Sequence, residues 1–351
     1  MTDPLLAVED LHVQFDTPDG TLRAVDGVSF TVDRGETVCL VGESGSGKTV
    51  SCEALTGLLP TPPGEVTQGT VRFDGADLTT YSETQLRAVR GDRIAHVFQN
   101  PQGALDPVYT VGEQLVEAIG YHRDVSKAAA RERAIDLLDR VGIPTPGTRV
   151  DEYPHEFSGG MKQRVVVALA LTCEPDLLVA DEPTTALDVT TEAQLLDLLA
   201  DLQAEFDMAI LFVTHDLGVV AEIADRVVVM YGGKVMEQGD VFDVFDRTAH
   251  PYTAALMKAL PGKGALQPIG GDLVDPVDPP DGCRFAPRCE HATPACTSGG
   301  QPPLYATGDG RRAPADDEVH GDATAGHSAS CVYYGPHHDR DDLDLESDSD
   351  A

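Results

Sequence analysis

Apolar and polar positions alternate over short stretches near the start of the chain, which is the pattern of half-buried β-strands. The alternation runs from Leu5 to Phe15 and resumes from Arg23 to Val32, with a turn sequence at 17–20 between them. A further short strand is predicted between Gly69 and Gly75. These segments predict a small antiparallel layer, and the continuously apolar run at 37–41 predicts a buried strand beside it.

The middle of the chain has helical periodicity instead. A strand is predicted from Ile94 to Gln99, after which Val111–Ile119 and Lys127–Val141 carry their apolar residues on one helical face. This helical pattern extends to about Cys173. Because strand patterns resume directly afterwards, we expect the segment from about 100 to 173 to be a helical subdomain inserted into a sheet.

Strands and helices alternate after this insertion. A helix is predicted from about Glu192 to Phe206, and Thr191 and Gln194 have the spacing of a capping box at its start. Alternating strands and helices predict an α/β fold with a mainly parallel sheet, to which the antiparallel β layer and the inserted helical subdomain are added. The strands of this part are predicted at Leu177–Ala180, Ile210–Val213 and Val227–Tyr231.

The composition changes after residue 248, where Pro, Gly and Cys become frequent. We therefore expect a first domain over 1–250 and a loop-rich extension over 251–334 that is too small to bury a large core. Residues 335–351 carry seven Asp or Glu and almost nothing apolar, so they are predicted to be disordered.

The charge of the chain limits its partners. The formal net charge is −34 over 351 residues, and only six of the basic residues are lysines. Nucleic acid is not expected as the main partner, because phosphate backbones require Lys and Arg patches. Dense carboxylate with little lysine indicates adaptation to a high-salt cytoplasm, where screening reduces self-repulsion. An acidic interaction surface is the alternative.

Neither a signal peptide nor a run of 18 apolar residues is recognisable, so we expect a cytosolic protein without a membrane span. A reducing cytosol argues against a disulfide framework for its seven cysteines. Three of them, Cys39, Cys52 and Cys173, lie inside strand or helix patterns and are predicted to be core residues.

A complete phosphate-loop motif, G-x-x-x-x-G-K-T, follows the apolar strand at 37–41, and a helix is predicted after it from Val50 to Leu59. Its glycines allow the backbone to aim successive N–H groups at one anion, next to the positive end of a helix dipole. The lysine would reach the terminal phosphates and the threonine hydroxyl would coordinate magnesium. A chance glycine turn is the alternative. The residues of the motif are Gly42, Glu43, Ser44, Gly45, Ser46, Gly47, Lys48 and Thr49.

Two acids, Asp181 and Glu182, end the strand that begins at Leu177. In a phosphate-loop protein Asp181 belongs beside the magnesium, and Glu182 could act as general base toward the attacking water. A solvated acid pair at a strand end is the alternative. His215 ends another strand at the same predicted edge of the sheet, where a γ-phosphate contact is needed, although a lone histidine there is usually structural.

A second glycine pair opens a second helix at Ser158-Gly159-Gly160, and it repeats the anion-binding logic of the first loop. Two such nests with one set of acids suggest a triphosphate that is gripped from both sides. The phosphate loop, Gln99, this glycine pair, the two acids, Asp188 and His215 occur in an order that resembles the ATP-binding subunit of an ABC transporter, over residues 5 to about 250.

This resemblance implies roles for individual residues. Phe15 would stack on adenine, and Gln99 would contact magnesium and water and report the nucleotide state to membrane domains. Ser158 and Gly160 would grip the γ-phosphate held by an opposite subunit, so that ATP closes a head-to-tail dimer. In the same way Asp188 would link the two sites, and His215 would complete catalysis with Glu182.

Further motifs resemble the oligopeptide/dipeptide importer branch of this family. The resemblance implies a peripheral protein on the cytoplasmic face of the membrane that works with two transmembrane permease subunits, and indirectly with an extracellular solute-binding protein. Met161 stands where the glycine-pair motif usually has Gln, which suggests a heterodimer with a sister ATPase subunit. The motifs are Gln99-Asn100-Pro101, Leu105-Asp106-Pro107, Tyr153 to Phe157, Ser158 to Met161, His250-Pro251-Tyr252 and Gly282 to Cys289.

Two other functions remain open. The cargo of an importer of this kind could be nickel or another solute, because an external binding protein and the channel select it. A soluble ABC ATPase of DNA repair or translation is less consistent with this chain. Such proteins carry two ATPase units, a long coiled coil or basic surfaces, whereas this chain has a single unit and a strongly acidic charge.

Four cysteines lie in the extension, at Cys283, Cys289, Cys296 and Cys331, with gaps of five, six and 34 residues. Structural zinc usually takes ligands in closer pairs, whereas wider gaps are compatible with an iron–sulfur cluster. The resemblance also implies a [4Fe–4S] cluster here in some members of the branch, with zinc and free thiols as alternatives. We expect this unit to stabilise the extension without touching the ATP chemistry.

Overall fold

The structure is a computed structural model, and it consists of two compact units that are described separately. Unit 1 comprises Met1–Thr31, Val38–Thr79 and Thr214–Ala351, and unit 2 comprises Val32–Thr37 and Thr80–Val213. The structure describes residues 3–99, 101–185, 187–260, 269–307 and 326–336, together with 338, 343 and 345. No helix within these residues is both long enough and apolar enough to cross a bilayer.

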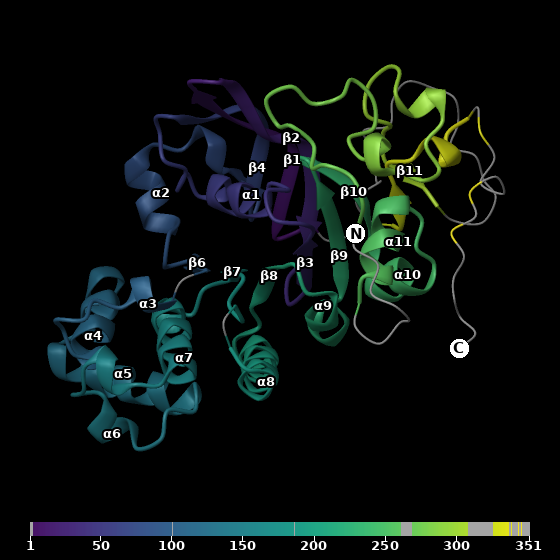
Figure 1. Cartoon of the computed structure of the whole chain (residues 1–351). Helices are drawn as coiled ribbons and strands as arrows, with labels where there is room; N and C mark the ends of the chain where they lie inside the picture. Colours follow the sequence, from purple (N-terminus) through teal and green to yellow (C-terminus); the bar gives the residue numbers. More distant parts are fainter. Residues whose placement is uncertain are drawn as a thin grey trace. The chain divides into compact units, whose positions relative to one another are not determined.

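The antiparallel layer predicted at the start of the chain is present in unit 1. Its strands are β1 (Leu6–Thr17), β2 (Gly20–Val32), β4 (Gly64–Phe73) and β5 (Ala76–Asp77), in the order β2-β1-β4-β5 (Figure 1). One face of β1 and β2 is buried in alternation, as the sequence pattern requires.

A second sheet of unit 1 has β3 (Thr37–Val41) beside β9 (Arg226–Tyr231), which run parallel. On the other side of β9 the sheet continues antiparallel through β10 (Lys234–Asp240), β12 (Ser328–Ala329) and β11 (Tyr305–Ala306). Residues from the C-terminal extension therefore form the outer strands of a sheet that begins with the phosphate-loop strand.

A buried carboxylate fastens the extension to this sheet. Glu237 on β10 has no exposed surface, and it accepts hydrogen bonds from the backbone N–H groups of Ala249 and His250 at 2.8 and 2.9 Å. The same carboxylate lies 2.8 Å from Nε2 of His327. The segments at 249–250 and at 327 thus both bond to the buried Glu237 of β10. These hydrogen bonds satisfy the charge of its carboxylate.

Unit 2 contains three parallel strands, β6 (Ile94–Val97), β7 (Leu177–Asp181) and β8 (Ala209–Thr214). The chain between β6 and β7 is helical, and α4 (Val111–His122), α5 (Lys127–Arg140) and α7 (Gly159–Ala170) pack together there (Figure 1). The α/β fold with a mainly parallel sheet, an antiparallel layer and an inserted helical subdomain is confirmed.

The other elements are short, apart from the helix between β7 and β8. They are α1 (Lys48–Leu55), η1 (Leu78–Thr80), α2 (Glu83–Val89), α3 (Pro101–Ala104), α6 (Pro146–Arg149), η2 (Pro154–Glu156), η3 (Leu171–Cys173), α8 (Val189–Phe206), α9 (Leu217–Ile223), α10 (Val241–Asp246), α11 (Pro251–Lys258), η4 (Ala286–Arg288), η5 (Pro294–Cys296) and η6 (Val332–Tyr334).

Helices α1 and α8 differ from the sequence prediction in their bounds. Helix α1 ends at Leu55 rather than Leu59, because Gly57 adopts a left-handed φ of 65° and its neighbour Leu58 donates to the Glu53 carbonyl in a Schellman cap. Helix α8 begins at Val189, and Asp188 is its N-cap through a 3.0 Å bond from the Thr191 N–H. The predicted capping box at Thr191 is therefore wrong.

The strand cores are almost wholly aliphatic, and the three cysteines predicted for the core, Cys39, Cys52 and Cys173, are buried. Most of 335–351, predicted to be disordered, lies outside the described residues. Leu343 is described, and it packs against Cys331 and Tyr333.

Candidate functional site

The phosphate loop of unit 1 is shaped so that only glycine fits at two of its positions. Gly42 has φ 154°, and a Cβ there would lie 2.1 Å from the carbonyl oxygen of Met230. Gly47 has φ 100°, and its Cβ would lie 2.4 Å from the carbonyl oxygen of Ala24. The loop is thus pressed against the neighbouring backbone on both sides, which fixes the path that its N–H groups follow.

Lys48 is the first residue of α1, and its ammonium group points back over the loop. The side chain is buried, and Nζ donates to the carbonyl oxygens of Gly42 and Glu43 at 2.7 and 2.9 Å and to Oγ of Ser46 at 3.3 Å. Thr49 is exposed beside it. The loop thus holds a cation and an exposed threonine hydroxyl, which are the groups that a phosphate and its metal require.

The other two unit 1 residues of the predicted site are Phe15 and His215. Phe15 lies opposite Gly64 in the β1–β4 ladder, where its ring covers the glycine so closely that a Cβ at 64 would lie 2.8 Å from Cε1. His215 directly follows β8 and is exposed. After it, Asp216 caps α9 by accepting a 2.7 Å hydrogen bond from the Gly218 N–H.

Unit 2 brings together Gln99 and Glu182, which are 83 residues apart in sequence. Nε2 of Gln99 donates to Oε2 of Glu182 at 2.8 Å, and the Thr185 hydroxyl donates to the same oxygen at 3.1 Å. Glu182 itself has a left-handed φ of 46°, and its N–H bonds to the carbonyl of Val213. Asp181, the last residue of β7, is buried.

The Ser158-Gly159-Gly160 motif forms the start of α7, where the Ser158 hydroxyl accepts a hydrogen bond from the Met161 N–H at 3.3 Å. Ser158 and Gly159 are exposed. Gly160 packs against Thr191 so closely that a Cβ would lie 2.6 Å from its methyl group. Asp188 holds the same threonine through its N–H and its hydroxyl, and these bonds lower the pKa of the Asp188 carboxyl.

Residues of the C-terminal extension contact the phosphate loop. Arg288 forms two hydrogen bonds to the Glu43 carboxylate of the phosphate loop, at 2.6 and 3.1 Å. The hydroxyl of Tyr252 accepts a 2.9 Å hydrogen bond from the Glu43 N–H. These contacts could not be predicted from sequence, because Arg288 and Tyr252 lie 245 and 209 residues from their partner.

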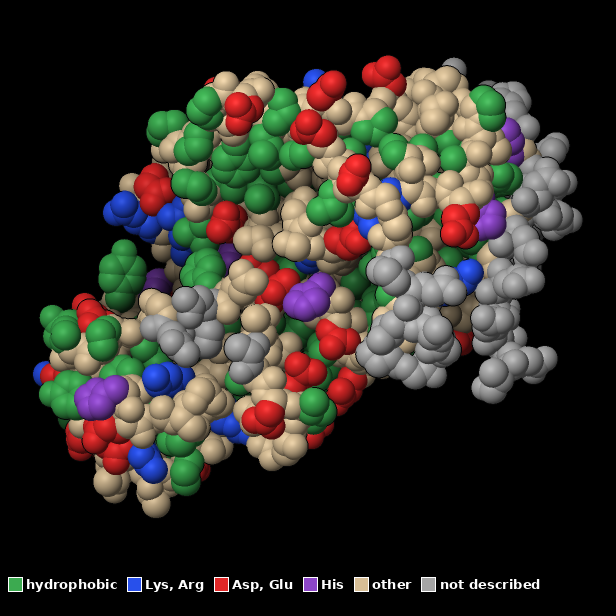
Figure 2. Space-filling view, in the orientation of Figure 1, with side chains coloured by type: hydrophobic (Ala, Val, Ile, Leu, Met, Phe, Trp, Pro, Cys, Tyr) green, Lys and Arg blue, Asp and Glu red, His purple; other side chains and the backbone are tan. Residues whose placement is uncertain are grey.

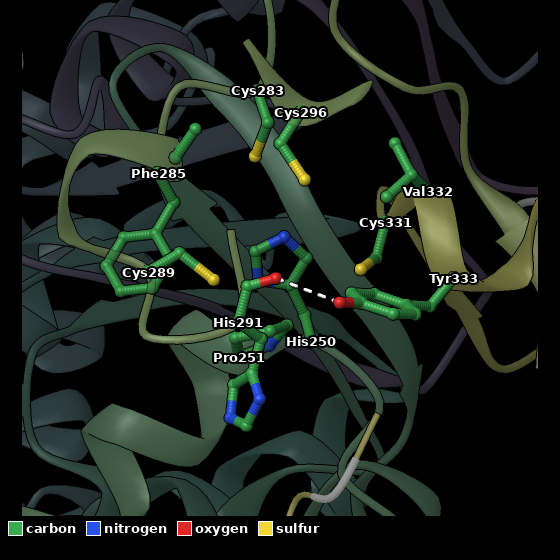
Figure 3. Close-up of a pocket in the computed structure, with 11 residues that line it drawn as sticks. His250, Pro251, Cys283, Phe285, Cys289, His291, Cys296, Cys331, Val332 and Tyr333 are labelled. Carbon is green, nitrogen blue, oxygen red and sulfur yellow. Dashed lines mark hydrogen bonds between the residues drawn. The ribbon is translucent and has the colours of Figure 1, made fainter. Parts of the chain in front are cut away.

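The four cysteines of the extension line one pocket (Figure 3). Their sulfur atoms point toward a common space, which His250 and Phe285 border, and the Tyr333 hydroxyl closes one side by donating to the His291 carbonyl at 3.0 Å. No three of these sulfurs lie within 4.8 Å of one another in the described structure. A single zinc ion with Zn–S bonds near 2.3 Å requires sulfurs about 3.8 Å apart, so no three of these sulfurs stand at the spacing of zinc ligands.

Burial raises the pKa of these thiols, to about 11 for Cys289 and about 12 for Cys331, and it also raises that of Cys283. Backbone N–H groups oppose this effect, since they point at the sulfurs of all three. Cys296 accepts from the N–H of Thr293 at 3.5 Å. The pocket therefore favours neutral thiols by its dryness, yet it supplies the donors that a set of metal-bound thiolates would need.

Residues 25–185 match the ABC transporter family, and residues 236–296 match the family described as the oligopeptide/dipeptide transporter, C-terminal region. The chain is 49% identical to the dipeptide transport ATP-binding protein DppD of Bacillus subtilis over 298 residues, which are 84% of this chain and 89% of that one. Its identity to DppD of Escherichia coli is 47% over 321 residues, 89% of this chain and 98% of that one.

Solved structures agree with this assignment. A dimeric post-hydrolysis ATP-binding cassette bound to ADP and Pi matches with a TM-score of 0.61 and 26% identity, over 67% of this chain and 98% of that chain. A component of an ABC transporter complex from Clostridium perfringens matches with a TM-score of 0.60 and 31% identity, over 70% of this chain and 92% of that chain. The chain belongs to the ABC transporter family of ATP-binding proteins, in the branch that carries the oligopeptide/dipeptide transporter C-terminal region.

Proposed function

We propose that this chain binds and hydrolyses ATP with Mg²⁺, and that hydrolysis powers the import of dipeptides and oligopeptides through separate transmembrane subunits. The observation that carries the proposal is a phosphate loop that leaves no room for a Cβ at Gly42 and Gly47, closed by the buried Lys48, in a chain 47–49% identical to dipeptide transport ATP-binding proteins over most of its length. The proposed ATPase domain is 1–250, with 251–334 as the transporter-type extension and 335–351 as a disordered acidic tail.

The residues of each unit divide the chemistry between them. The phosphate loop binds the phosphates, with Lys48 as the positive charge, and the partly exposed ring of Phe15 stacks on adenine. Thr49 and Asp181 offer the hydroxyl and carboxylate oxygens that Mg²⁺ prefers, and Gln99 is the third candidate ligand. The bound metal would neutralise the charge on the phosphates.

Glu182 takes the proton of the attacking water in this proposal. Its carboxylate is held by Gln99 and Thr185, so the general base is oriented before water arrives. Because Gln99 donates a hydrogen bond to the Glu182 carboxylate, a change in the position of Glu182 can be passed to the loop that follows Gln99. That loop would report the nucleotide state to membrane subunits. His215 assists at the γ-phosphate, and its exposed position after β8 leaves it accessible.

We propose a head-to-tail dimer as the active state. The exposed start of α7 at Ser158 and Gly159 offers N–H groups to the γ-phosphate of an opposite subunit, and Asp188 caps α8 close to this motif through Thr191, where it would link the two sites. Met161 in place of the usual Gln favours a heterodimer with a sister ATPase. Two permease subunits and an extracellular solute-binding protein complete the proposed assembly, with this chain on the cytoplasmic face of the membrane.

We further propose that the chain is adapted to high salt. Carboxylates are spread over the face shown in Figure 2 and are not collected in one patch. This distribution is expected if the net charge of −34 does not arise from a single acidic interaction surface. Screening at molar salt removes much of the repulsion between such charges.

We propose that the cysteine pocket holds a [4Fe–4S] cluster rather than zinc. Four soft sulfur ligands face one space, no three of them lie within 4.8 Å of one another in the described structure, and backbone N–H groups point at them. Cys283, Cys289, Cys296 and Cys331 would hold the group. When bound, it would supply iron–thiolate bonds that join Cys331 to the loop containing the other three and would ionise thiols that the dry pocket keeps neutral.

The test of the function is transport by the assembled complex. The chain, its sister ATPase and the permease subunits would be reconstituted in vesicles with the binding protein, and uptake of labelled dipeptides and of nickel would be compared with and without ATP. We expect ATP-dependent peptide uptake that is lost when Glu182→Gln is introduced. ATP-dependent uptake of nickel without peptide uptake would replace the cargo, and the absence of any ATP-dependent uptake would contradict the transport function.

A further inference from the structure

Glu43, the second residue of the phosphate loop, is held by residues of the C-terminal extension. The two hydrogen bonds from Arg288 to its carboxylate form a bidentate ion pair, and Tyr252 accepts from its backbone N–H. Its carbonyl oxygen accepts the 2.9 Å hydrogen bond from Lys48. Glu43 thus connects the extension directly to the lysine that binds phosphate.

Arg288 is held in place by contacts other than its ion pair with Glu43. Its side chain is only 4% exposed, and its other guanidinium hydrogens go to the carbonyl oxygens of Ile269 and Gly270 at 3.0 and 2.9 Å and to the Tyr231 hydroxyl at 3.1 Å. The guanidinium carbon lies 5.5 Å from the ring centre of Tyr231 and 6.0 Å from that of Phe285. A buried and stacked arginine of this kind loses little further freedom when it binds a carboxylate.

The aromatic residues around Arg288 form one cluster with Tyr252. The ring centres of Tyr231 and Tyr252 are 4.7 Å apart, and those of Tyr252 and Phe285 are 5.1 Å apart. Tyr252 is fully buried, and burial raises the pKa of its hydroxyl, which therefore stays neutral beside the Glu43 N–H. The extension therefore offers Glu43 a rigid surface and not a mobile side chain.

A carboxylate in a loop that binds phosphate needs an explanation, because it repels the anionic ligand. The loop attracts phosphate through its N–H groups, the dipole of α1 and Lys48, whereas Glu43 adds one negative charge to the same eight residues. The ion pair with Arg288 neutralises this charge, and the Glu43 side chain is 25% exposed. The favourable field of the loop consequently depends on a residue of the extension.

We propose that Arg288 is a positioning residue of the nucleotide site, which holds and neutralises Glu43 so that the affinity of the phosphate loop for ATP depends on the C-terminal extension. This inference rests on the proposed function, because it assumes that the phosphate loop binds ATP. The inference gives the extension a role in nucleotide binding in addition to its structural role. It does not require any group in the cysteine pocket.

The test is a double-mutant cycle read as the Kd for ATP of the purified full-length chain. In Arg288→Gln the Glu43 carboxylate is left unpaired beside the phosphates, and we expect the Kd to rise about tenfold, which is about 1.4 kcal/mol of binding. In Glu43→Gln the negative charge is absent and the Arg288 guanidinium remains, so the Kd should fall below that of the parent. The double variant should recover most of the affinity lost in Arg288→Gln.

Arg284→Gln is the matched control. Arg284 is a second buried arginine of the same extension, but it pairs with Asp26 on β2, and none of the hydrogen bonds found for it among the described residues goes to the loop. The Arg284→Gln substitution should lower the melting temperature as Arg288→Gln does, and it should leave the Kd for ATP unchanged. Arg288→Lys keeps the charge without the bidentate geometry, and it should give an intermediate Kd even where the glutamine variant folds poorly.

The outcomes separate the inference from the function on which it rests. If the parent chain binds ATP but the double variant is as weak as Arg288→Gln, the loss is structural and the inference is overturned. An equal loss of affinity in Arg284→Gln has the same consequence. If the parent chain does not bind ATP at all, the proposed function itself fails.

Discussion

Replacing Glu182 with glutamine separates water activation from nucleotide binding. The glutamine side chain has the same shape, and its amide oxygen can accept the hydrogen bonds that Gln99 and Thr185 now donate to Oε2. The left-handed backbone at this position, with φ 46°, strains glutamate and glutamine alike. The substitution therefore removes the negative charge and the capacity to take a proton, and little else.

The size of the effect follows from the role. A positioned general base contributes about 10²–10⁴-fold to a rate, which is about 2.7–5.5 kcal/mol of barrier at 1.36 kcal/mol per tenfold. We expect phosphate release to fall by this factor. The Kd for ATP should change by less than about threefold, because the phosphate loop and Lys48 belong to another unit of the structure and are not altered. With turnover blocked, ATP should hold the closed dimer.

Three measurements on the purified chain decide the matter: phosphate release, the Kd for ATP, and size-exclusion chromatography with ATP. They are best made at molar KCl, given the net charge of −34. Glu174→Gln is the control, because this exposed carboxylate of unit 2 pairs with Arg133 in a surface salt bridge. A loss of hydrolysis below tenfold, or a Kd that rises in parallel with it, would refute the assignment of Glu182 as base.

Three further predictions concern the loop, the charge and the cysteines. Lys48→Ala should weaken ATP binding itself by at least tenfold in the same binding assay, since it removes the buried cation of the loop, and an unchanged Kd would contradict the phosphate-loop assignment. The melting temperature should rise steeply as KCl goes from low to molar concentration, and a flat or falling curve would remove the high-salt proposal. Anaerobically purified protein should be brown, with about four irons per chain, and Cys289→Ser should bleach it and expose residues 270–334 to proteolysis. Colourless protein with one zinc would contradict the cluster.

Those parts of the site that lie in consecutive residues were predictable from the sequence. The phosphate loop is one such part, because eight neighbouring residues contain both the glycines that the backbone requires and the lysine that it positions. At Gly42 and at Gly47 a Cβ would collide with a backbone carbonyl oxygen, which explains why the motif has glycine at these two positions. Strand and helix types were predicted for the same reason, from periodicity within short windows.

Competing local signals explain the error at α8. Thr191 and Gln194 have capping-box spacing, but Asp188 lies three residues earlier and its carboxylate accepts hydrogen bonds from both the N–H and the hydroxyl of Thr191. An aspartate N-cap is as favourable as threonine or better, so the helix gains a turn at its start. Sequence alone offered both signals and no means to rank them.

The contacts of the extension could not be predicted, because they depend on pairs that are far apart in sequence. Strand β12 has two residues, too few for any periodicity, and it becomes part of the sheet only by pairing with Glu237 and Gln238 of β10. Arg288 carries no mark that distinguishes it from other arginines until the fold places it against Glu43. Composition indicated a separate loop-rich unit, whereas the structure joins it to the sheet.

The position of Arg288 changes what a cysteine substitution should do. Arg288 is the last residue of η4, its N–H bonds to the Phe285 carbonyl, and the next residue is Cys289, whose sulfur faces the pocket. Cys283 begins the same short segment and also lines the pocket. Any change that moves this segment therefore moves the guanidinium that neutralises Glu43. Loss of a group bound to the thiols would consequently loosen the extension and also weaken ATP binding. The cysteine pocket of the extension would thus influence the phosphate loop near the start of the chain.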